Sequence, residues 1–391
     1  MGVSQKLVVR ALAEVSGLDS TDIAHRMMGN WQPTAATFAA LLAREHSVTD
    51  LSKPYPFLLA HPIEQNQNLQ DLLGDSAQWQ VEWKWDGIRS QLIRRAGQIF
   101  LWSRGEELVT DRYPEIAEMA TQLPDGLVLD GELLPWDEAA GVQPFAKLQQ
   151  RIGRKALSKK LLREIPVVFL AYDMLEINGE SCRAQPLTWR RAQLECIVSA
   201  IPHAHLKISP VVSASTWEAL TPLREESRAR SVEGFMLKRR DSAYGVGRVR
   251  GDWWKWKIAP YSVDAVLIYA QRGSGKRASL YTDYTLGVWD GAGEQRKLVP
   301  FAKAYSGLTD NEIAQVDKFI RRNTQEKFGP VRTVTPELVF EIAFEGIQQS
   351  ARHKSGIAVR FPRILRWRQD KTIEDADSLE TIKGLIGEAT Q

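Results

Sequence analysis

The chain has 391 residues, more than one typical domain core holds, so two or three domains are expected. Hydrophobic residues make up 43% and charged residues 25%, as in soluble globular proteins, and no apolar run reaches the length of a membrane span. The net charge of +3 is too small to indicate nucleic acid by itself, and the two cysteines, Cys182 and Cys196, exclude a paired-cysteine zinc site and favour a reduced cytosol.

Residues 1–50 are predicted to be helical. Apolar residues recur near helical spacing at Leu7, Val8, Leu12 and Val15. Asp19–Thr21 suits a helix cap, and a further helix is expected over about Ala35–Glu45. The proline-rich stretch Lys53–Pro56 then predicts a linker, so this helical segment is expected to form a unit of its own.

Residues 51–258 mix strands and helices and are expected to form one domain. The predicted strands are Trp79–Arg94, Gln98–Arg104, Gly126–Leu134, Val167–Leu175, Gly234–Arg239 and Trp253–Ile258. The predicted helices are Ile116–Leu123, Phe145–Ile152 and Leu187–Ile201. Helices do not regularly separate the strands, which predicts an α+β fold with a largely antiparallel sheet.

Residues 259–391 have a different character and are expected to form a second domain. Short strands are predicted at Val263–Gln271, Leu280–Trp289, Leu298–Ala304, Leu338–Phe344 and Ala358–Trp367. One helix is expected at Asn311–Arg322, and glycine-rich turns separate the early strands. Short strands with one helix are typical of a small β-barrel such as the oligonucleotide-binding (OB) fold.

The segment VEWKWDGIR, residues 81–89, alternates charged and apolar side chains. Glu82, Lys84 and Asp86 are expected on one strand face and the tryptophans on the other. The charged face is either solvated or aimed into a cavity. Several of the 13 tryptophans lie beside cations, a pattern that fits nucleic-acid stacking as well as it fits a core face.

Lys84 begins a K-x-D-G pattern, which chance alone produces in roughly one chain in ten of this length. Four further clusters follow in a fixed order: Asp130–Glu132, Phe169–Asp173, Glu233–Lys238 and Trp254–Lys257. Further motifs read SRGEE at residues 103–107, FEGIQQSARHKSGIAVRFP at 344–362 and RFPRILRWRQDK at 360–371. On these motifs the chain resembles the covalent nucleotidyltransferases, and specifically the ATP-dependent DNA ligases, over about residues 75–371.

The resemblance implies an adenylation (nucleotidyltransferase) domain with antiparallel sheets over residues 51–258 and an OB-fold domain over 259–391. Residues 1–45 resemble only the closing helices of the helical DNA-binding domain of larger ligases. The chain is then either a truncated form or a ligase with a reduced grip on DNA. The second reading carries the hypothesis that it forms lysyl-AMP normally but binds nicks weakly, and nick affinity equal to that of a ligase with the full helical domain would count against it.

The implied chemistry assigns Lys84 as the nucleophile, which takes AMP from ATP before AMP passes to a 5′ phosphate and is displaced by a 3′ hydroxyl. An ordinary lysine with a pKa near 10.4 is only ~0.1% neutral at pH 7.5, a handicap of roughly 4 kcal/mol. Neighbouring cations lower such a pKa. The candidates for this role are Arg89, Lys238, Lys255 and Lys257.

Further roles follow from the resemblance alone. Glu82 is expected at the adenine amino group and Tyr172 on the purine face. Arg89 and Glu132 are expected at the ribose, and Arg104 on the phosphate side. The other expected nucleotide contacts are Lys238, Lys255 and Lys257, with Arg368, Asp370 and Lys371 orienting the leaving pyrophosphate. Glu132 and Glu233 are the candidate Mg²⁺ ligands, and Asp86 is assigned to a metal or to the 3′ hydroxyl.

Alternatives stay open at this point. K-x-D-G chemistry is shared with RNA ligases and GTP-using capping enzymes, and a non-catalytic nucleic-acid clamp is a different class. Gly273–Lys276 lacks the full phosphate-loop pattern, and His203 and His205 lack a third metal ligand. The expected partners are nicked duplex DNA and ATP, for a monomer in the bacterial cytosol without a membrane, acting in repair, replication or recombination; Arg360 and Arg363 are expected to face the DNA.

Overall fold

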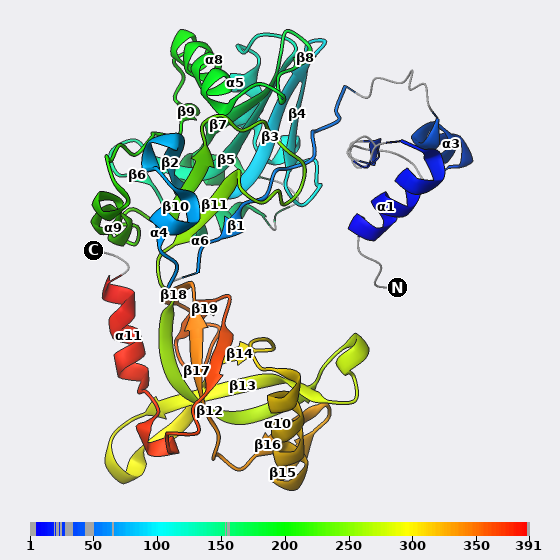
Figure 1. Ribbon diagram of the computed structural model, residues 1–391. Helices are drawn as coiled ribbons and strands as arrows, with labels where there is room; N and C mark the ends of the chain where they lie inside the picture. Colours follow the sequence, from blue (N-terminus) through cyan, green and yellow to red (C-terminus); the bar gives the residue numbers. More distant parts are fainter. Residues whose placement is uncertain are drawn as a thin grey trace. The chain divides into compact units, whose positions relative to one another are not determined.

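The computed structural model describes residues 5–18, 20, 23, 26–27, 34–43, 51–64, 66–152, 154 and 157–388. The chain divides into two compact units, Met1–Ile258 and Ala259–Gln391 (Figure 1). The further boundary expected near residue 50 stays a prediction. Within the described ranges, no helix combines the length and the apolar character needed to cross a membrane.

The amino-terminal segment contains helices α1 (Gln5–Ser16) and α3 (Ala35–Leu42). Helix α3 begins after Thr34, whose hydroxyl accepts a hydrogen bond from the Thr37 backbone N–H at 3.2 Å, while the Thr37 hydroxyl accepts one from the Thr34 N–H. This reciprocal pairing satisfies two otherwise unpaired backbone donors. Asp19 and Thr21 of the predicted cap, and the predicted end of the second helix at Glu45, lie outside the described residues.

A four-stranded sheet has the order β1-β11-β10-β2, and β10 is antiparallel to both of its neighbours. Its strands are β1 (His61–Pro62), β2 (Trp79–Trp85), β10 (Val232–Arg239) and β11 (Trp253–Lys257). One face packs against helices α4 (Leu69–Leu73) and α9 (Trp217–Glu225) in a core that contains Trp83, Trp254 and Trp256. The prediction that the tryptophans of β2 face a core is therefore confirmed for Trp83.

The second sheet of this unit has the path β4-β3-β5-β7-β8, with β6 paired to β5 and β9 paired to β7. Its strands are β3 (Ile88–Arg95), β4 (Gln98–Ser103), β5 (Leu127–Asp137), β6 (Gly141–Val142), β7 (Val167–Ile177), β8 (Glu180–Ser181) and β9 (Leu206–Ile208). Among the strand pairs that the structure describes in this sheet, only β7–β9 is parallel. The accompanying helices are α5 (Pro114–Ala120), α6 (Phe145–Ile152), α7 (Lys159–Glu164) and α8 (Leu187–Ala200), of which α5, α6 and α8 contribute apolar side chains to the core of this sheet.

The prediction of one strand over Trp79–Arg94 is wrong, because the chain changes sheets at Asp86–Gly87. Strand β2 ends at Trp85 in the four-stranded sheet, and β3 begins at Ile88 in the other sheet (Figure 1). A Cβ atom at Gly87 would lie 2.3 Å from the Leu133 carbonyl oxygen, so only glycine permits this approach to β5. The crossing brings the polar end of β2 next to the second sheet.

The carboxy-terminal unit is built on a curled seven-stranded antiparallel sheet, as expected for an OB fold. Its strands are β12 (Tyr261–Arg272), β13 (Tyr281–Asp290), β14 (Lys297–Ala304), β15 (Thr324–Phe328), β16 (Val331–Val334), β17 (Val339–Phe344) and β20 (Arg363–Trp367). The hairpin β18 (Gly346–Gln349) and β19 (Ile357–Arg360) forms a separate two-stranded sheet. Helices α10 (Asp310–Arg322) and α11 (Leu379–Glu388) contribute Ile320 and Ile382 to the core of the unit.

The prediction of one strand over Ala358–Trp367 is also wrong. The chain turns at Phe361, which has φ +52°, and Pro362 follows without a backbone donor. As a result β19 pairs with β18, while β20 pairs with β17. The turn leaves the Phe361 side chain 63% exposed.

Candidate active site

The polar face of the four-stranded sheet gathers the charged residues of three strands. Side chains alternate along a strand, so Glu82 and Lys84 share the face opposite Trp83. The strand register places Met236 of the central strand β10 opposite Glu82 of β2 and opposite Lys255 of β11. This face therefore carries Gln80, Glu82, Lys84, Lys238, Lys255 and Lys257.

A bulge in β10 turns Glu233 toward these cations. The register shifts between Val232 and Phe235, and Gly234 has φ +126°. A Cβ atom at Gly234 would lie 2.3 Å from the Trp256 carbonyl oxygen, so the bulge requires glycine. Lys84 Nζ donates a hydrogen bond to Glu233 Oε2, and Lys257 Nζ lies 3.3 Å from the same oxygen.

Glu82 is fixed by a second set of contacts, in which its side chain is only 1% exposed. Lys238 Nζ lies 2.7 Å from Glu82 Oε1, and Gln80 Nε2 donates to the same oxygen at 2.8 Å. The Lys238 ammonium lies 4.4 Å from the ring centroid of Tyr172 and 4.6 Å from that of Trp253. Lys238 and Glu82 therefore form a desolvated ion pair beneath aromatic rings, away from solvent.

The second sheet contributes Arg89, Glu132 and Tyr172. Arg89 donates to Asp130 at 2.7 and 3.2 Å and to the Leu58 carbonyl at 2.7 Å, and the Tyr244 hydroxyl donates to Asp130 at 2.6 Å. Burial opposes the Arg89 charge, but the Asp130 carboxylate holds the pKa of Arg89 well above its ordinary value. Arg89 is thus anchored by a carboxylate of the Asp130–Glu132 cluster.

Glu132 lies directly across the strand pair from Arg89, and its carboxylate has no hydrogen bond or ion pair with the described part of the chain. Burial raises the pKa of Glu132 to about 8, against the opposing charges of Lys84 and Arg89. Those charges also show that Glu132 lies within electrostatic reach of Lys84. A poorly solvated carboxylate without a partner at this position is available to a ligand.

Replacing Glu132 by glutamine is expected to change the pH dependence of stability. The pKa of Glu132 is raised from 4.5 to about 8 in the folded chain, so folding favours the protonated carboxyl group. The stability that this protonation contributes is lost as the pH rises from 4.5 to about 8. The free energy of unfolding of the wild type should therefore fall relative to that of Glu132→Gln between about pH 4.5 and pH 8. Urea unfolding across this range measures it, with Glu138→Gln as control; a pH-independent difference contradicts the prediction.

Two of the four cations expected near Lys84 have carboxylate partners of their own. Arg89 pairs with Asp130, and Lys238 pairs with Glu82. Lys255 remains, and its own pKa is lowered by burial and by the charges of Lys257, Lys84 and Arg248. Sequence reasoning missed Gln80 and Arg248. It named Asp130 as part of the Asp130–Glu132 cluster but gave it no role.

The structure also describes three further predicted residues, Tyr172, Arg104 and Asp86. Tyr172 is 7% exposed, and burial raises its pKa well above the ordinary value. Arg104 is exposed, and its backbone N–H donates to the Arg89 carbonyl at 2.9 Å. Asp86 lies outside β2, in the break between the two sheets, so it does not continue the strand face of Glu82 and Lys84.

Arg368 and Lys371 belong to the carboxy-terminal unit and share a carboxylate there. Arg368 donates to both oxygens of Asp264, at 3.0 and 3.1 Å, and to Asp370 at 2.7 Å. Lys371 Nζ donates to Asp264 at 2.6 Å. The side-chain hydrogen bonds with Arg368 hold the pKa of Asp370 below its ordinary value.

The carboxylates fit a magnesium ion that also binds substrate phosphates. Among the described residues, no group of three or more His, Cys, Asp or Glu is arranged to hold a metal ion. Mg²⁺ usually keeps several waters and takes one or two carboxylates together with phosphate oxygens. Glu132, which has no partner among those residues, and Glu233 are sufficient for such a site.

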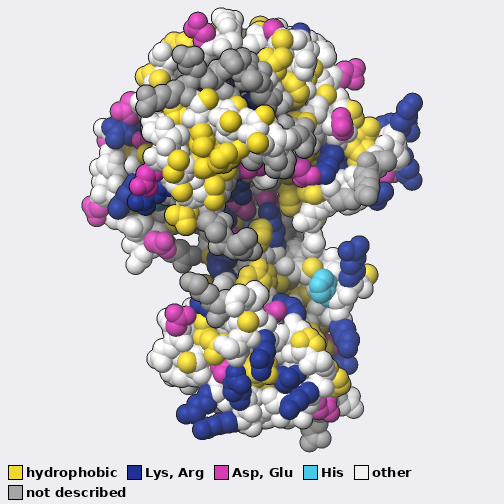
Figure 2. All heavy atoms as spheres, turned by 90° about the vertical axis from the view of Figure 1, so that its right-hand side faces the viewer, with side chains coloured by type: hydrophobic (Ala, Val, Ile, Leu, Met, Phe, Trp, Pro, Cys, Tyr) yellow, Lys and Arg dark blue, Asp and Glu magenta, His cyan; other side chains and the backbone are white. Residues whose placement is uncertain are grey.

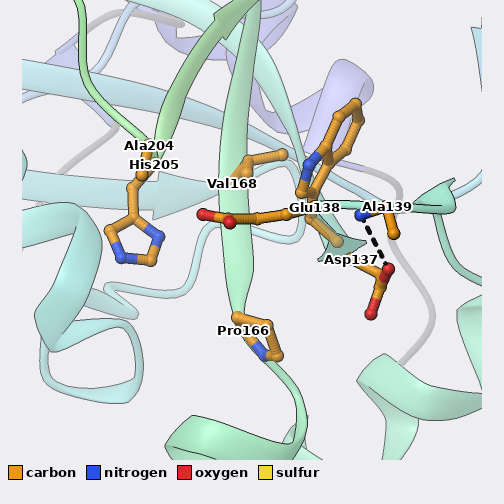
Figure 3. A pocket seen from close by; sticks show the side chains of 8 residues that line it. Asp137, Glu138, Ala139, Pro166, Val168, Ala204 and His205 are labelled. Carbon is orange, nitrogen blue, oxygen red and sulfur yellow. Dashed lines mark hydrogen bonds between the residues drawn. The ribbon is translucent and has the colours of Figure 1, made fainter.

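The two lookalike motifs do not form sites of their own. His205 lines a cavity of about 380 Å³ with Asp137, Glu138 and Pro166 (Figure 3). Its Nδ1 is hydrogen-bonded to the Val167 carbonyl at 2.8 Å, which orients the ring for packing. Gly273–Lys276 lies in the loop between β12 and β13, not between a strand and a helix as a phosphate loop requires.

Comparison with known families decides the class of the protein. The family model "ATP dependent DNA ligase domain" matches residues 58–257, which contain all of the cluster around Lys84. The chain belongs to the ATP-dependent DNA ligase family. A second model, "ATP dependent DNA ligase C terminal region", matches residues 277–371 of the other unit. The protein is therefore a DNA ligase that uses ATP, and repair, replication and recombination are typical roles of this family.

Individual relatives agree with this assignment. A probable DNA ligase of Koribacter versatilis is 34% identical, with 97% of this chain and 68% of the relative covered. A DNA ligase of Methanococcoides burtonii is 30% identical, with 98% of this chain and 68% of the relative covered. A solved Lig E DNA ligase has the same fold, with a TM-score of 0.55, 19% identity, and coverage of 80% of this chain and 99% of that one.

Proposed function

We propose that the ligase seals nicks in duplex DNA and that Lys84 carries AMP from ATP to the DNA. The observation that supports this is the position of Lys84 Nζ on Glu233, beside Lys257, at the end of the strand face that begins with Glu82. An amine, a carboxylate and a second ammonium at one point provide a nucleophile, a proton acceptor and a phosphate ligand.

The first step uses residues of this cluster. The Lys84 amine attacks the α-phosphorus of ATP, a phosphorus–nitrogen bond forms, and the bond to pyrophosphate breaks. The proton that the ammonium must lose is received by Glu233 Oε2, which already accepts its hydrogen bond. Lys255 and Lys257 offset the negative charge that develops on the phosphates. AMP then passes to the 5′ phosphate of the nick, and the 3′ hydroxyl displaces it.

The base and the ribose are assigned to the buried residues. Tyr172 is proposed to stack on the purine and Glu82 to accept from its amino group. Glu132 is proposed to contact the ribose. Arg89 is proposed to act indirectly, through its hydrogen bonds to Asp130, by stabilising this side of the site. Arg104, and in the other unit Arg368 with Lys371, are proposed for the phosphates.

Magnesium is proposed as the divalent ion, held by Glu132 and Glu233 together with ATP oxygens. Once bound, it would neutralise phosphate charge during transfer. Asp86 remains assigned to this metal or to the attacking 3′ hydroxyl. The carboxylate of Glu132 supports the proposal, because it has no protein partner within the described ranges.

The OB-fold unit is proposed to hold the DNA. Figure 2 shows Lys and Arg side chains gathered on the face of this unit that it draws, and the exposed cations of the unit include Lys318, Arg322 and Lys327. At the turn after β19, Phe361 is 63% exposed, and the Arg360 guanidinium lies 5.0 Å from its ring centroid. An exposed aromatic ring beside a cation is suited to contact bases and phosphates.

The double variant Arg360→Ala/Phe361→Ala is expected to seal nicks at least ~10-fold more slowly, because it loses a phosphate contact and an apolar contact to the DNA. Formation of the AMP adduct should be unchanged, because neither residue is among those proposed to contact ATP. Single-turnover sealing of a nicked duplex and protein labelling measure the two rates. Arg296→Ala, an exposed cation of the same unit, is the control. Equal loss of both activities would contradict a DNA-contacting role.

Labelling with α-labelled nucleotides tests the proposed function. The protein is mixed with Mg²⁺ and labelled ATP or GTP and then denatured; stable label from ATP is expected. Label from GTP alone would indicate a capping enzyme, and no label would indicate a non-catalytic clamp. Sealing of nicked DNA but not of nicked RNA is then expected, and the reverse preference would indicate an RNA ligase.

A further inference from the structure

The carboxylate of Glu82 is held from one side only. Both of its donors, Lys238 Nζ at 2.7 Å and Gln80 Nε2 at 2.8 Å, bind Oε1. Oε2 accepts no hydrogen bond from the described residues, and it is not among their fully buried polar atoms that lack a partner. Oε2 therefore retains a small accessible surface on the strand face that leads to Lys84.

Lys238 and Glu82 are each other's charge partners at a position shielded from solvent. The Lys238 side chain is 2% exposed and that of Glu82 is 1% exposed, so neither charge is solvated without the other. The rings of Tyr172 and Trp253 lie within 4.6 Å of the ammonium and leave the carboxylate as its only anionic partner among the described residues. An ionised carboxylate accepts hydrogen bonds and donates none.

We infer that Lys238 is a positioning residue that fixes Glu82 as an obligate acceptor and thereby sets the preference for adenine over guanine. The inference rests on the proposed function, in which Glu82 meets the purine. Adenine carries an amino group at position 6, and guanine carries a carbonyl oxygen there. A permanent acceptor pairs with the amino group, whereas it meets the carbonyl as a second acceptor and leaves both oxygens unpaired.

Loss of the Lys238 charge removes this constraint. A buried carboxylate without its cation takes up a proton, because desolvation disfavours the charged form. Protonated Glu82 has a donor as well as an acceptor, so it binds the guanine carbonyl as readily as the adenine amino group. The role assigned to Lys238 is therefore different from the direct nucleotide contact that the resemblance implies.

The test is Lys238→Met, which removes the charge and retains most of the side-chain volume. Adduct formation is measured with α-labelled ATP, GTP and purine riboside triphosphate, which lacks the 6-amino group. The ratio of the ATP rate to the GTP rate is expected to fall by about 10- to 100-fold, the range of a hydrogen bond to a charged group. The wild-type preference for ATP over purine riboside triphosphate should persist, because protonated Glu82 still accepts a hydrogen bond from the 6-amino group.

Controls separate this role from a structural one. Lys255→Met, on the same strand face, should slow all three nucleotides by the same factor. If Lys238→Met also slows all three equally, the inference is overturned. If Lys238→Met does not fold, the double variant Lys238→Met/Glu82→Gln removes both charges; it should show the same relaxed ratio, and an intact ATP preference would overturn the inference. No label from any nucleotide in the wild type would instead refute the proposed function.

Discussion

Replacing Lys84 by arginine is expected to reduce AMP transfer to the protein by about a thousandfold or more. The guanidinium pKa is above 12, so a neutral nucleophilic nitrogen is essentially absent near pH 7.5. Arginine keeps the positive charge next to Glu233, so the ion pair with Glu233 is expected to be retained. The loss therefore reports on nucleophilicity and not on local charge.

Protein-bound label from α-labelled ATP, measured after denaturation, checks this expectation. Lys207→Arg is a matched control, because Lys207 lies on β9 with its ammonium 4.9 Å from the Trp136 ring centroid, among residues that do not contact Lys84. The control is expected to take up label at the wild-type rate. Label that persists in Lys84→Arg would show that another residue is the nucleophile. Lys84→Arg should still bind ATP, which equilibrium binding without Mg²⁺ tests separately.

Replacing Arg190 by methionine is expected to destabilise the chain by roughly 3–5 kcal/mol. Arg190 and Asp173 form an ion pair in which both side chains are 0% exposed, with contacts of 2.7 and 2.9 Å. Arg190 also donates to the Ser242 carbonyl at 3.0 Å. Methionine would leave a buried carboxylate without a counter-charge. Asp173 adjoins Tyr172, the residue proposed to stack on the purine, so Tyr172 should become less ordered as well.

Differential scanning calorimetry measures this loss as a lower midpoint of unfolding, by roughly 10 °C for a unit of this size. Arg191→Met is the matched control on the same helix. Arg191 pairs with Glu195, whose side chain is 53% exposed, so the carboxylate left behind is solvated and the cost should be smaller. If both substitutions lowered the midpoint of unfolding equally, the buried ion pair would contribute no more to stability than the partly solvated one. Arg190→Met/Asp173→Leu should recover part of the stability, because no buried charge remains.

The contrast between two lysines of the cluster follows from their partners. Lys84 shares Glu233 with Lys257 at a position where its side chain is 22% exposed, while Lys238 is sealed against Glu82. A partly exposed ammonium can exchange its carboxylate for a substrate phosphate, whereas a sealed one cannot do so without leaving Glu82 unpaired. This difference supports the assignment of Lys84 to chemistry and of Lys238 to positioning.

The sequence by itself determined the class of the protein and led to the proposal of its chemically active residues. The reaction requires an amine, carboxylates and cations, and these occur as five short clusters in a fixed order from Lys84 to Lys257. Local patterns also predicted the elements in which regular periodicity is strong. Helix α6 runs over Phe145–Ile152 as predicted, and the alternation around Trp83 identified its core face.

Only the tertiary structure decided how these residues pair. The break at Gly87 and the turn at Phe361 divide runs that read as single strands, because local propensity does not report which sheet a strand joins. The bulge at Gly234 turns Glu233 against the alternation of its strand. The partnership of Lys238 with Glu82 depends on a strand register that joins residues 156 positions apart in the chain, a long-range contact that a local pattern does not encode.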